Sequence, residues 1–295
     1  MNGALSQFKD AIRAAGLEPP AVIKPGLFHR FPGVGKRDGN KAGWCTLFED
    51  GPGGCFGDWS SGLSKTWQAK RNTLSSRAER VAFTRRIEAA KQQVEAERNA
   101  RWADAAKRAA TIWNATTPAL GSHPYLIRKH IQPHGARLHR GALTLPVKDF
   151  TGRLTSLQFI AADSSKRLLA GGRKRGCVIP VAGGTTHPVR VVICEGWATG
   201  CTLAEDEPAV LVLAAIDAGN LELVTLSARC RWPSAEMVIA GDDDRMTAGN
   251  PGATKAKAAA MASGALLALP QWPENAPDHL TDFNDLAVWL AGGSV

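Results

Sequence analysis

The stretch VRVVICEGWATG, residues 189–200, decides the fold of the second half of the chain. Its first six residues are mostly apolar and β-branched, which is typical of a strand buried on both faces of a parallel sheet. The runs AVLVLAAI (209–216) and MVIAG (237–241) have the same character, and three predicted helices alternate with them: WATGCTLAEDE, NLELVTLSAR and TKAKAAAMASGALLA. This order predicts a small doubly wound parallel α/β domain over residues 189–295.

Acidic residues directly follow two of these predicted strands. Glu195 follows the first strand, and an aspartate triplet at 242–244 follows the third. Because ligands bind outside the carboxyl ends of strands in open parallel sheets, we expect both groups at one edge of the sheet. A later segment, TDFNDL at 281–286, adds a third acidic group before a short predicted helix. The candidate metal ligands are therefore Glu195, Asp242, Asp244, Asp282 and Asp285.

Crowded carboxylates repel one another unless cations bind among them. Mg²⁺ and Mn²⁺ prefer carboxylate oxygens, and a pair of such ions can activate a hydroxyl and neutralise the phosphates of a nucleotide. The pattern indicates two or more of these ions and a nucleic-acid phosphodiester substrate. Gly196 and Gly241 are expected to let phosphates approach the backbone. Acidic turns and helix caps would explain Asp282 equally well, but they explain three consecutive aspartates poorly.

Charge is divided unevenly along the chain. Residues 1–188 contain 30 Lys and Arg against 13 Asp and Glu, whereas residues 189–295 contain 6 against 14. A basic region joined to an acidic domain suits a polyanionic substrate held over a metal site. The same basic excess could also serve only solubility.

The first 188 residues are expected to form three regions. Residues 1–69 begin with a short helix and continue as a small β-rich module rich in turn residues. Residues 70–117 form a basic helical linker, with neither Gly nor Pro between 70 and 113. Residues 118–188 form a basic mixed α/β subdomain. In the first module, Trp44 and Trp59 lie among basic residues and could stack on single-stranded template, although such aromatic residues more often form a core.

The cysteines predict reduced thiols rather than a metal centre. The six cysteines include no C-x-x-C pair and do not cluster with histidine, so no zinc is expected. No run of 18 apolar residues occurs, which predicts a cytoplasmic protein without membrane contact.

The segments EGWATG, GDDDR and DFND together resemble the Toprim domain, in the variant found in DNA primases of conjugative plasmids and phages. The segment AAIDAGNL at 214–221 is also similar to that subgroup. The resemblance implies that Glu195 is the general acid/base and that Asp242 and Asp244 bind metal, whereas it leaves the role of Asp243 open. Asp282 and Asp285 match the later acidic pair of the family more loosely.

The resemblance extends upstream to the catalytic core of bacterial replicative primases. Lys166-Arg167-Leu168 and Arg175-Gly176 are similar to motifs of its basic subdomain. This implies that Lys166 contacts a nucleoside triphosphate or the nascent primer and acts with the catalytic carboxylates. A solvated basic hairpin would explain the same residues. The expected nucleotide- and DNA-binding set is Lys166, Arg167, Arg173, Lys174, Arg175, Arg128, Lys129 and Arg245.

These features predict a DNA primase that makes short primers on single-stranded DNA from nucleoside triphosphates, in plasmid or phage replication. Any replicative helicase would act in trans or lie beyond a truncated C-terminus, since no helicase motif occurs. The alternatives are a metal-dependent Toprim nuclease and a non-catalytic DNA-binding Toprim module. A topoisomerase needs a tyrosine nucleophile, and the one tyrosine, Tyr125, precedes the domain.

Overall fold

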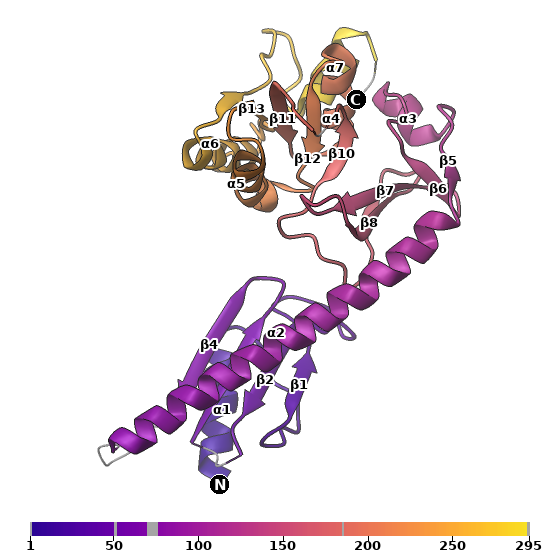
Figure 1. Ribbon diagram of the computed structural model, residues 1–295. Helices are drawn as coiled ribbons and strands as arrows, with labels where there is room; N and C mark the ends of the chain where they lie inside the picture. The colour runs from indigo at the N-terminus through magenta and orange to yellow at the C-terminus, as the bar shows by residue number, and fades with distance from the viewer. Residues whose placement is uncertain (1, 50–51, 70–75, 185, 294–295) are drawn as a thin grey trace. The chain divides into compact units, whose positions relative to one another are not determined.

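The computed structural model describes residues 2–49, 52–69, 76–184 and 186–293, and the chain divides into two units, Met1–Asn99 and Ala100–Val295 (Figure 1). The division falls within helix α2 (Arg77–Asn114). Each end of this helix packs within its own unit: Ile87 and Ala90 contact the first unit's sheet, whereas Ala109 and Trp113 join a core in the second. The segment expected as a linker is thus also part of both cores.

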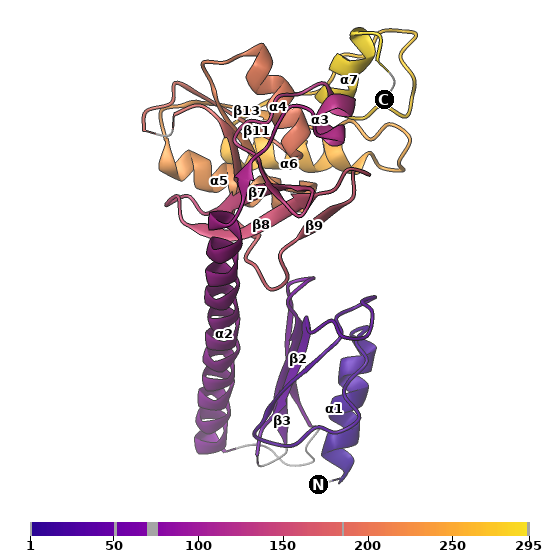
Figure 2. The same cartoon turned by 90° about the vertical axis from the view of Figure 1, so that its right-hand side faces the viewer.

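The first unit is a four-stranded antiparallel sheet between two helices (Figure 2). Helix α1 (Asn2–Ala14) precedes strands β1 (Phe28–Phe31), β2 (Gly43–Leu47), β3 (Gly53–Asp58) and β4 (Leu63–Gln68), which lie in chain order. Successive side chains of β2 point to opposite faces. Cys45 and Leu47 therefore join Phe8 of α1, whereas Trp44 joins Ala90 of α2. The predicted β-rich module is confirmed.

The second unit begins with an antiparallel sheet of five strands in chain order. They are β5 (Thr117–Pro118), β6 (Arg137–His139), β7 (Ala142–Lys148), β8 (Leu154–Ile160) and β9 (Lys166–Leu168), with helix α3 (Pro124–Lys129) between β5 and β6. Pro124 occupies the first turn of α3, where its missing N–H costs no hydrogen bond. The predicted short helix and hairpin strands are present.

The predicted doubly wound domain follows, with a sheet in the order β10-β12-β11-β13-β14. The strands are β10 (Ile179–Ala182), β11 (Arg190–Cys194), β12 (Leu211–Ala214), β13 (Glu236–Ala240) and β14 (Leu266–Ala268). The helices are α4 (Trp197–Asp206), the 3-10 helix η1 (Ala218–Asn220), α5 (Leu221–Arg231), α6 (Pro251–Ser263) and α7 (Phe283–Leu290). Helices α5 and α6 cover one face and α4 the other (Figure 1).

Two strands of this sheet differ from the sequence expectation. β10 pairs antiparallel with β12, so a segment assigned to the preceding subdomain completes the edge of the sheet. β14 was expected as the end of a helix, but Gly264 adopts a left-handed conformation (φ 63°) that ends α6 and releases the apolar residues after it. Both sheets of this unit share a core in which Leu145 of β7 and Val181 of β10 join Val192 of β11.

Candidate active site

The carboxyl ends of β11 and β13 bring the predicted acidic residues together. These strands are parallel neighbours, with Cys194 opposite Ala240 at their last residues. Glu195 follows the first of them, and Asp242 stands two residues beyond the second. After burial, the charges of Glu195, Asp282 and Asp244 raise the pKa of Asp242, and the charge of Asp244 raises the pKa of Glu195, because like charges at close range disfavour ionisation. The structure thus gathers Glu195, Asp242, Asp244 and Asp282 into one site, which we call the acidic edge.

Asp242 has a strongly raised pKa at the acidic edge. Burial, together with the charges of Glu195, Asp282 and Asp244, raises the pKa of Asp242 to about 8. Its Oδ1 atom is buried and has no hydrogen-bond partner among the described residues. A buried acceptor without a donor is costly, so this atom is suited to a cation.

Glu195 is held by the backbone of η1. The N–H of Ala218 donates a hydrogen bond to its carboxylate, which favours the charged form. Burial has the larger, opposite effect, and the nearby carboxylates of Asp244 and Asp217 add to it, so the pKa of Glu195 is raised. The charge of Lys166, on β9 of the other sheet, lowers the pKa of both Glu195 and Asp242. The structure therefore brings Lys166 close to the acidic edge.

Asp244 is oriented by the start of α6. Its Oδ2 accepts a hydrogen bond from the backbone N–H of Gly252 at 2.9 Å, and its own N–H donates to Oδ1 of Asn250 at 2.9 Å. A Cβ at Gly252 would lie 2.7 Å from the carbonyl oxygen of Asp242, so only glycine fits there. The loop and the helix start thus fix the direction of the Asp244 carboxylate.

Asp243 anchors the same loop from the inside. Its Oδ1 accepts from Nδ2 of Asn250 at 2.6 Å, its Oδ2 accepts from Nε1 of Trp272 at 2.8 Å, and its backbone N–H donates to the carbonyl of Thr281 at 2.6 Å. Both carboxylate oxygens are therefore satisfied by the protein. Asp243 ties the loop to two later segments. These contacts give Asp243 a structural role, whereas the motif alone had left its role open.

Asp282 and Asp285 have different surroundings. Asp282 is the N-cap of α7 and accepts from the N–H of Asp285 at 2.9 Å, and burial raises its pKa. Asp285 pairs with Lys129 at 2.8 Å and also accepts from the N–H of Thr281 at 3.1 Å. Asp282 therefore faces the acidic edge, whereas Asp285 and Lys129 join α7 to α3.

Other predicted basic residues also have protein partners. The guanidinium of Arg128 donates to Ser164 Oγ at 2.7 Å, and that of Arg245 donates to the carbonyl of Pro277 at 2.8 Å. Lys174 pairs with Asp217. Arg167 lies over the ring of Phe159 at 5.3 Å, Arg173 lies over Trp102 at 5.4 Å, and Arg175 is exposed.

Asn220 is an important residue that the sequence reasoning did not single out. Its Nδ2 donates to the carbonyls of Lys174, Cys177 and Ala215 at 2.9–3.2 Å, and its Oδ1 accepts from the N–H of Gly176 at 2.8 Å. The buried amide thus clamps the basic loop onto the end of β12. The sequence feature that could have indicated Asn220 is its position in the segment AAIDAGNL, which is similar to the plasmid and phage primases.

The roles expected for Gly241 and Trp44 are wrong. The space beside Gly241 is filled by α6, since a Cβ there would lie 2.5 Å from Cβ of Ala256, so this glycine serves helix packing rather than phosphate approach. Trp44 is 3% exposed, and its ring stacks on Phe28 at 6.0 Å, so it is a core residue and not an available stacking surface. Trp59 is partly buried, with the guanidinium of Arg30 4.6 Å from its ring.

The acidic edge fits a divalent cation. Among the described residues, no three His, Cys, Asp or Glu side chains form a ready-made chelating cluster. Mg²⁺ keeps several waters and often binds one or two carboxylates plus substrate phosphates, so it needs no such cluster. The partnerless Asp242 oxygen and the mutually repelling carboxylates supply suitable donors.

Comparison with known proteins identifies the domain. Residues 190–291 match the Toprim domain family. The chain is 33% identical over 318 residues to a DNA primase TraC of Escherichia coli, covering 97% of this chain and 30% of the relative. A second E. coli DNA primase TraC is 33% identical over 280 residues, covering 90% of this chain and 19% of the relative. The chain thus spans less than a third of the length of either relative.

Two solved structures are also similar in part. The primase fragment of the bacteriophage T7 primase-helicase protein has a TM-score of 0.43 and 12% identity, covering 90% of this chain and 96% of that one. The Aquifex aeolicus primase (zinc binding and RNA polymerase domains) has a TM-score of 0.42 and 12% identity, covering 98% and 82%. No helix in the described part of the chain is long and apolar enough to span a membrane. The family match and the sequence relatives confirm the predicted resemblance: residues 190–291 match the Toprim domain family, in a chain that is similar to the DNA primases TraC of Escherichia coli.

Proposed function

We propose that the chain synthesises short primers on single-stranded DNA from nucleoside triphosphates, by metal-dependent nucleotidyl transfer. The observation that carries the proposal is the acidic edge facing Lys166. Buried carboxylates with a partnerless oxygen suit cations, and a lysine beside them suits a phosphate. One site can thus hold both the metal and the triphosphate.

Asp242 and Asp244 would hold Mg²⁺ or Mn²⁺, with Asp282 alongside. Such ions supply charge neutralisation at the phosphates and lower the pKa of a bound hydroxyl. Glu195 is suited to accept the proton of the attacking 3′-hydroxyl, because the Ala218 N–H orients its carboxylate and burial raises its pKa. Lys166 would bind the triphosphate, and the loop clamped by Asn220 would direct Arg175 toward the template.

The expected partners follow from this reaction. Single-stranded DNA and nucleoside triphosphates are the substrates, the cytoplasm is the place that supplies both, and a replicative helicase would open the duplex in trans. The similarity to the TraC primases supports this assignment, although the chain covers under a third of their length.

The test is a priming assay with single-stranded DNA, ribonucleotides and Mg²⁺. The wild type should make oligonucleotides, and Glu195→Gln should reduce synthesis by at least about 10²-fold while DNA binding persists. The matched control is Glu236→Gln, which makes the same change at the amino end of β13, opposite the acidic edge. Cutting of the template without synthesis would assign the site to a nuclease, and near-normal synthesis by Glu195→Gln would remove that residue from the reaction.

A further inference from the structure

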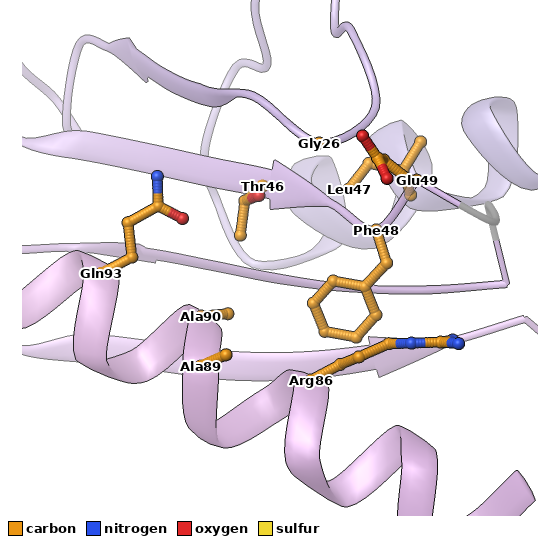
Figure 3. Close-up of a pocket in the computed structure, with 9 residues that line it drawn as sticks. All are labelled: Gly26, Thr46, Leu47, Phe48, Glu49, Arg86, Ala89, Ala90 and Gln93. Carbon is orange, nitrogen blue, oxygen red and sulfur yellow. The ribbon is translucent and has the colours of Figure 1, made fainter.

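The first unit contains a pocket of about 400 Å³ between the end of β2 and α2 (Figure 3). This volume lies within the range of about 300–1,000 Å³ that small-molecule sites occupy. Gln93 stands at one end of the pocket, Glu49 and Arg86 stand at the other, and the ring of Phe48 lies between them. None of these side chains belongs to the Toprim domain or to its motifs.

Small residues and strand geometry create this pocket. Thr46 and Phe48 point to the face of the sheet that α2 covers, and between Arg86 and Gln93 α2 presents the small side chains of Ala89 and Ala90 (Figure 3). Gly26 closes the rim, with its N–H donating to the carbonyl of Leu47 at 2.8 Å. The helix thus leaves space at this point of an otherwise packed interface.

Gly26 also secures the position of Glu49. It has a left-handed φ of 76°, and a Cβ there would lie 2.8 Å from Cγ of Glu49. A larger residue here would be strained in its backbone and would displace the Glu49 side chain from this position at the rim of the pocket. A carboxylate is thus kept at one end of a space with apolar walls.

The lining has the chemistry of a nucleobase site. Phe48 and the alanine methyls offer apolar walls to a flat ring, and Thr46, Gln93 and Glu49 offer hydrogen-bonding groups at its edges. Glutamine amides pair with adenine edges, and carboxylates accept hydrogen bonds from the exocyclic amino group of cytosine. Thymine has no exocyclic amino group and presents a carbonyl oxygen, which a carboxylate repels.

We propose that this pocket binds one base of a single-stranded DNA template, and that Glu49 selects a base with an exocyclic amino group over thymine. The inference rests on the proposed priming function, since it assigns that template a second contact. The basic charge of helix α2, which supplies one wall of the pocket, supports a strand as the source of the base, because it attracts the phosphates on either side of that base. Helix α2 as a whole carries 9 basic against 5 acidic residues.

The test measures binding of labelled oligo-dC and oligo-dT to the full chain, without nucleotides or metal. The wild type should bind oligo-dC about tenfold more tightly, which corresponds to about 1.4 kcal/mol. Glu49→Gln should bring this ratio close to one, because the amide of glutamine can turn to donate to thymine. Glu88→Gln is the matched control: it removes an equally exposed negative charge from α2 outside the pocket and should leave the ratio unchanged.

A second pair of variants tests the opposite end of the pocket. Gln93→Ala should weaken oligo-dC binding about fivefold or more, whereas Gln92→Ala, at the neighbouring exposed position of α2, should not. Ala89→Leu should fill the pocket and reduce the preference for oligo-dC without removing a charge. Circular dichroism of each variant checks that the fold is retained.

The outcomes separate the pocket from the active site. An unchanged dC to dT ratio in Glu49→Gln would overturn the proposal. Complete displacement of oligo-dC by micromolar dCMP would also overturn it, because the pocket would then bind free nucleotides. A wild type that binds oligo-dC selectively but makes no primers would refute the proposed function and leave the pocket assignment intact.

Discussion

The acidic edge and the pocket of the first unit are built in opposite ways. At the acidic edge, functional groups follow two neighbouring strands directly, so short motifs such as EGWATG and GDDDR contain most of the site. In the pocket, the lining groups come from Gly26, the end of β2 and the middle of α2, which are far apart in the sequence. The first arrangement is visible in the sequence, whereas the second exists only after folding.

The two regions also differ in how they treat charge. The acidic edge buries several carboxylates together, which raises the pKa of Asp242 to about 8 and leaves one of its oxygens without a hydrogen-bond partner in the part of the chain that the structure describes. In the pocket, the side chains of Glu49 and Arg86 are both exposed. Burying carboxylates for a cation therefore lowers the stability of the fold when no cation is bound. A pocket for a base, with its charged groups exposed, does not require this loss.

The largest effect is expected at Asp242. Asp242→Asn should abolish primer synthesis, because it removes a charged oxygen ligand from the acidic edge. The same variant should be more stable than the wild type in metal-free buffer, by about 1–3 kcal/mol, since folding no longer has to protonate a buried carboxyl group or bury its charge beside the other carboxylates. Synthesis assays and thermal unfolding with a chelator measure the two effects. Retained synthesis would contradict the ligand role, and a lower melting temperature would contradict the charge argument.

Asp243 provides the opposite case, one residue away. Asp243→Ala should lower stability by about 1–3 kcal/mol, because the amide of Asn250 and the indole N–H of Trp272 lose their acceptor. Synthesis should fall less than in Asp242→Asn, since no proposed metal ligand is removed. Chemical denaturation gives the stability change. Equal stability losses at both positions would show that the two aspartates do not have the separate roles that their contacts indicate.

The local order of strands and acidic residues was predictable because it depends on neighbours in sequence. The apolar runs in the sequence predict strands β11 and β13, and the parallel pairing of these strands brings Glu195 close to Asp242. The pairing of β10 with β12 was not predictable, because strand direction depends on a partner about 30 residues away. The contact between Lys129 and Asp285 spans 156 residues, and no local pattern marks it.

Two features that the sequence analysis missed were marked by residues close to them in the sequence. Gly264 is a helix-ending residue that separates α6 from β14, and Asn220 stands in a segment already recognised as similar to plasmid and phage primases. What the segment could not show is that the Asn220 amide makes three hydrogen bonds to a loop more than 40 residues earlier and a fourth to the carbonyl of Ala215. Likewise, the burial of Trp44 depends on α2 covering that face of the sheet. Composition alone could not separate this core residue from an exposed stacking surface.

A smaller effect is expected at Lys166. Lys166→Ala should weaken binding of nucleotide or primer several-fold and reduce the salt dependence of primer binding by about one phosphate contact. The measurement is affinity against salt concentration. Lys257→Ala, the same substitution on the exposed surface of α6, is the matched control and should leave the slope unchanged. An unchanged slope and unchanged synthesis in Lys166→Ala would make that residue a solvated hairpin charge.

The smallest effect on the stability of the second unit is expected from removing the first unit. A fragment of residues 100–295 keeps Trp102 beneath Arg173 and the packing of Ala109 and Trp113, so its melting temperature should stay within about 3 °C of that of the same unit in the full chain. A fragment starting near Lys107 loses Trp102 and should be less stable.

The 100–295 fragment should still make short products at high concentration, since the acidic edge and Lys166 lie within it. It should bind oligo-dC and oligo-dT equally, because Glu49 and Gln93 are absent. A retained dC preference would place base selection in the second unit, and loss of all synthesis would mean that the acidic edge needs the first unit for more than template binding.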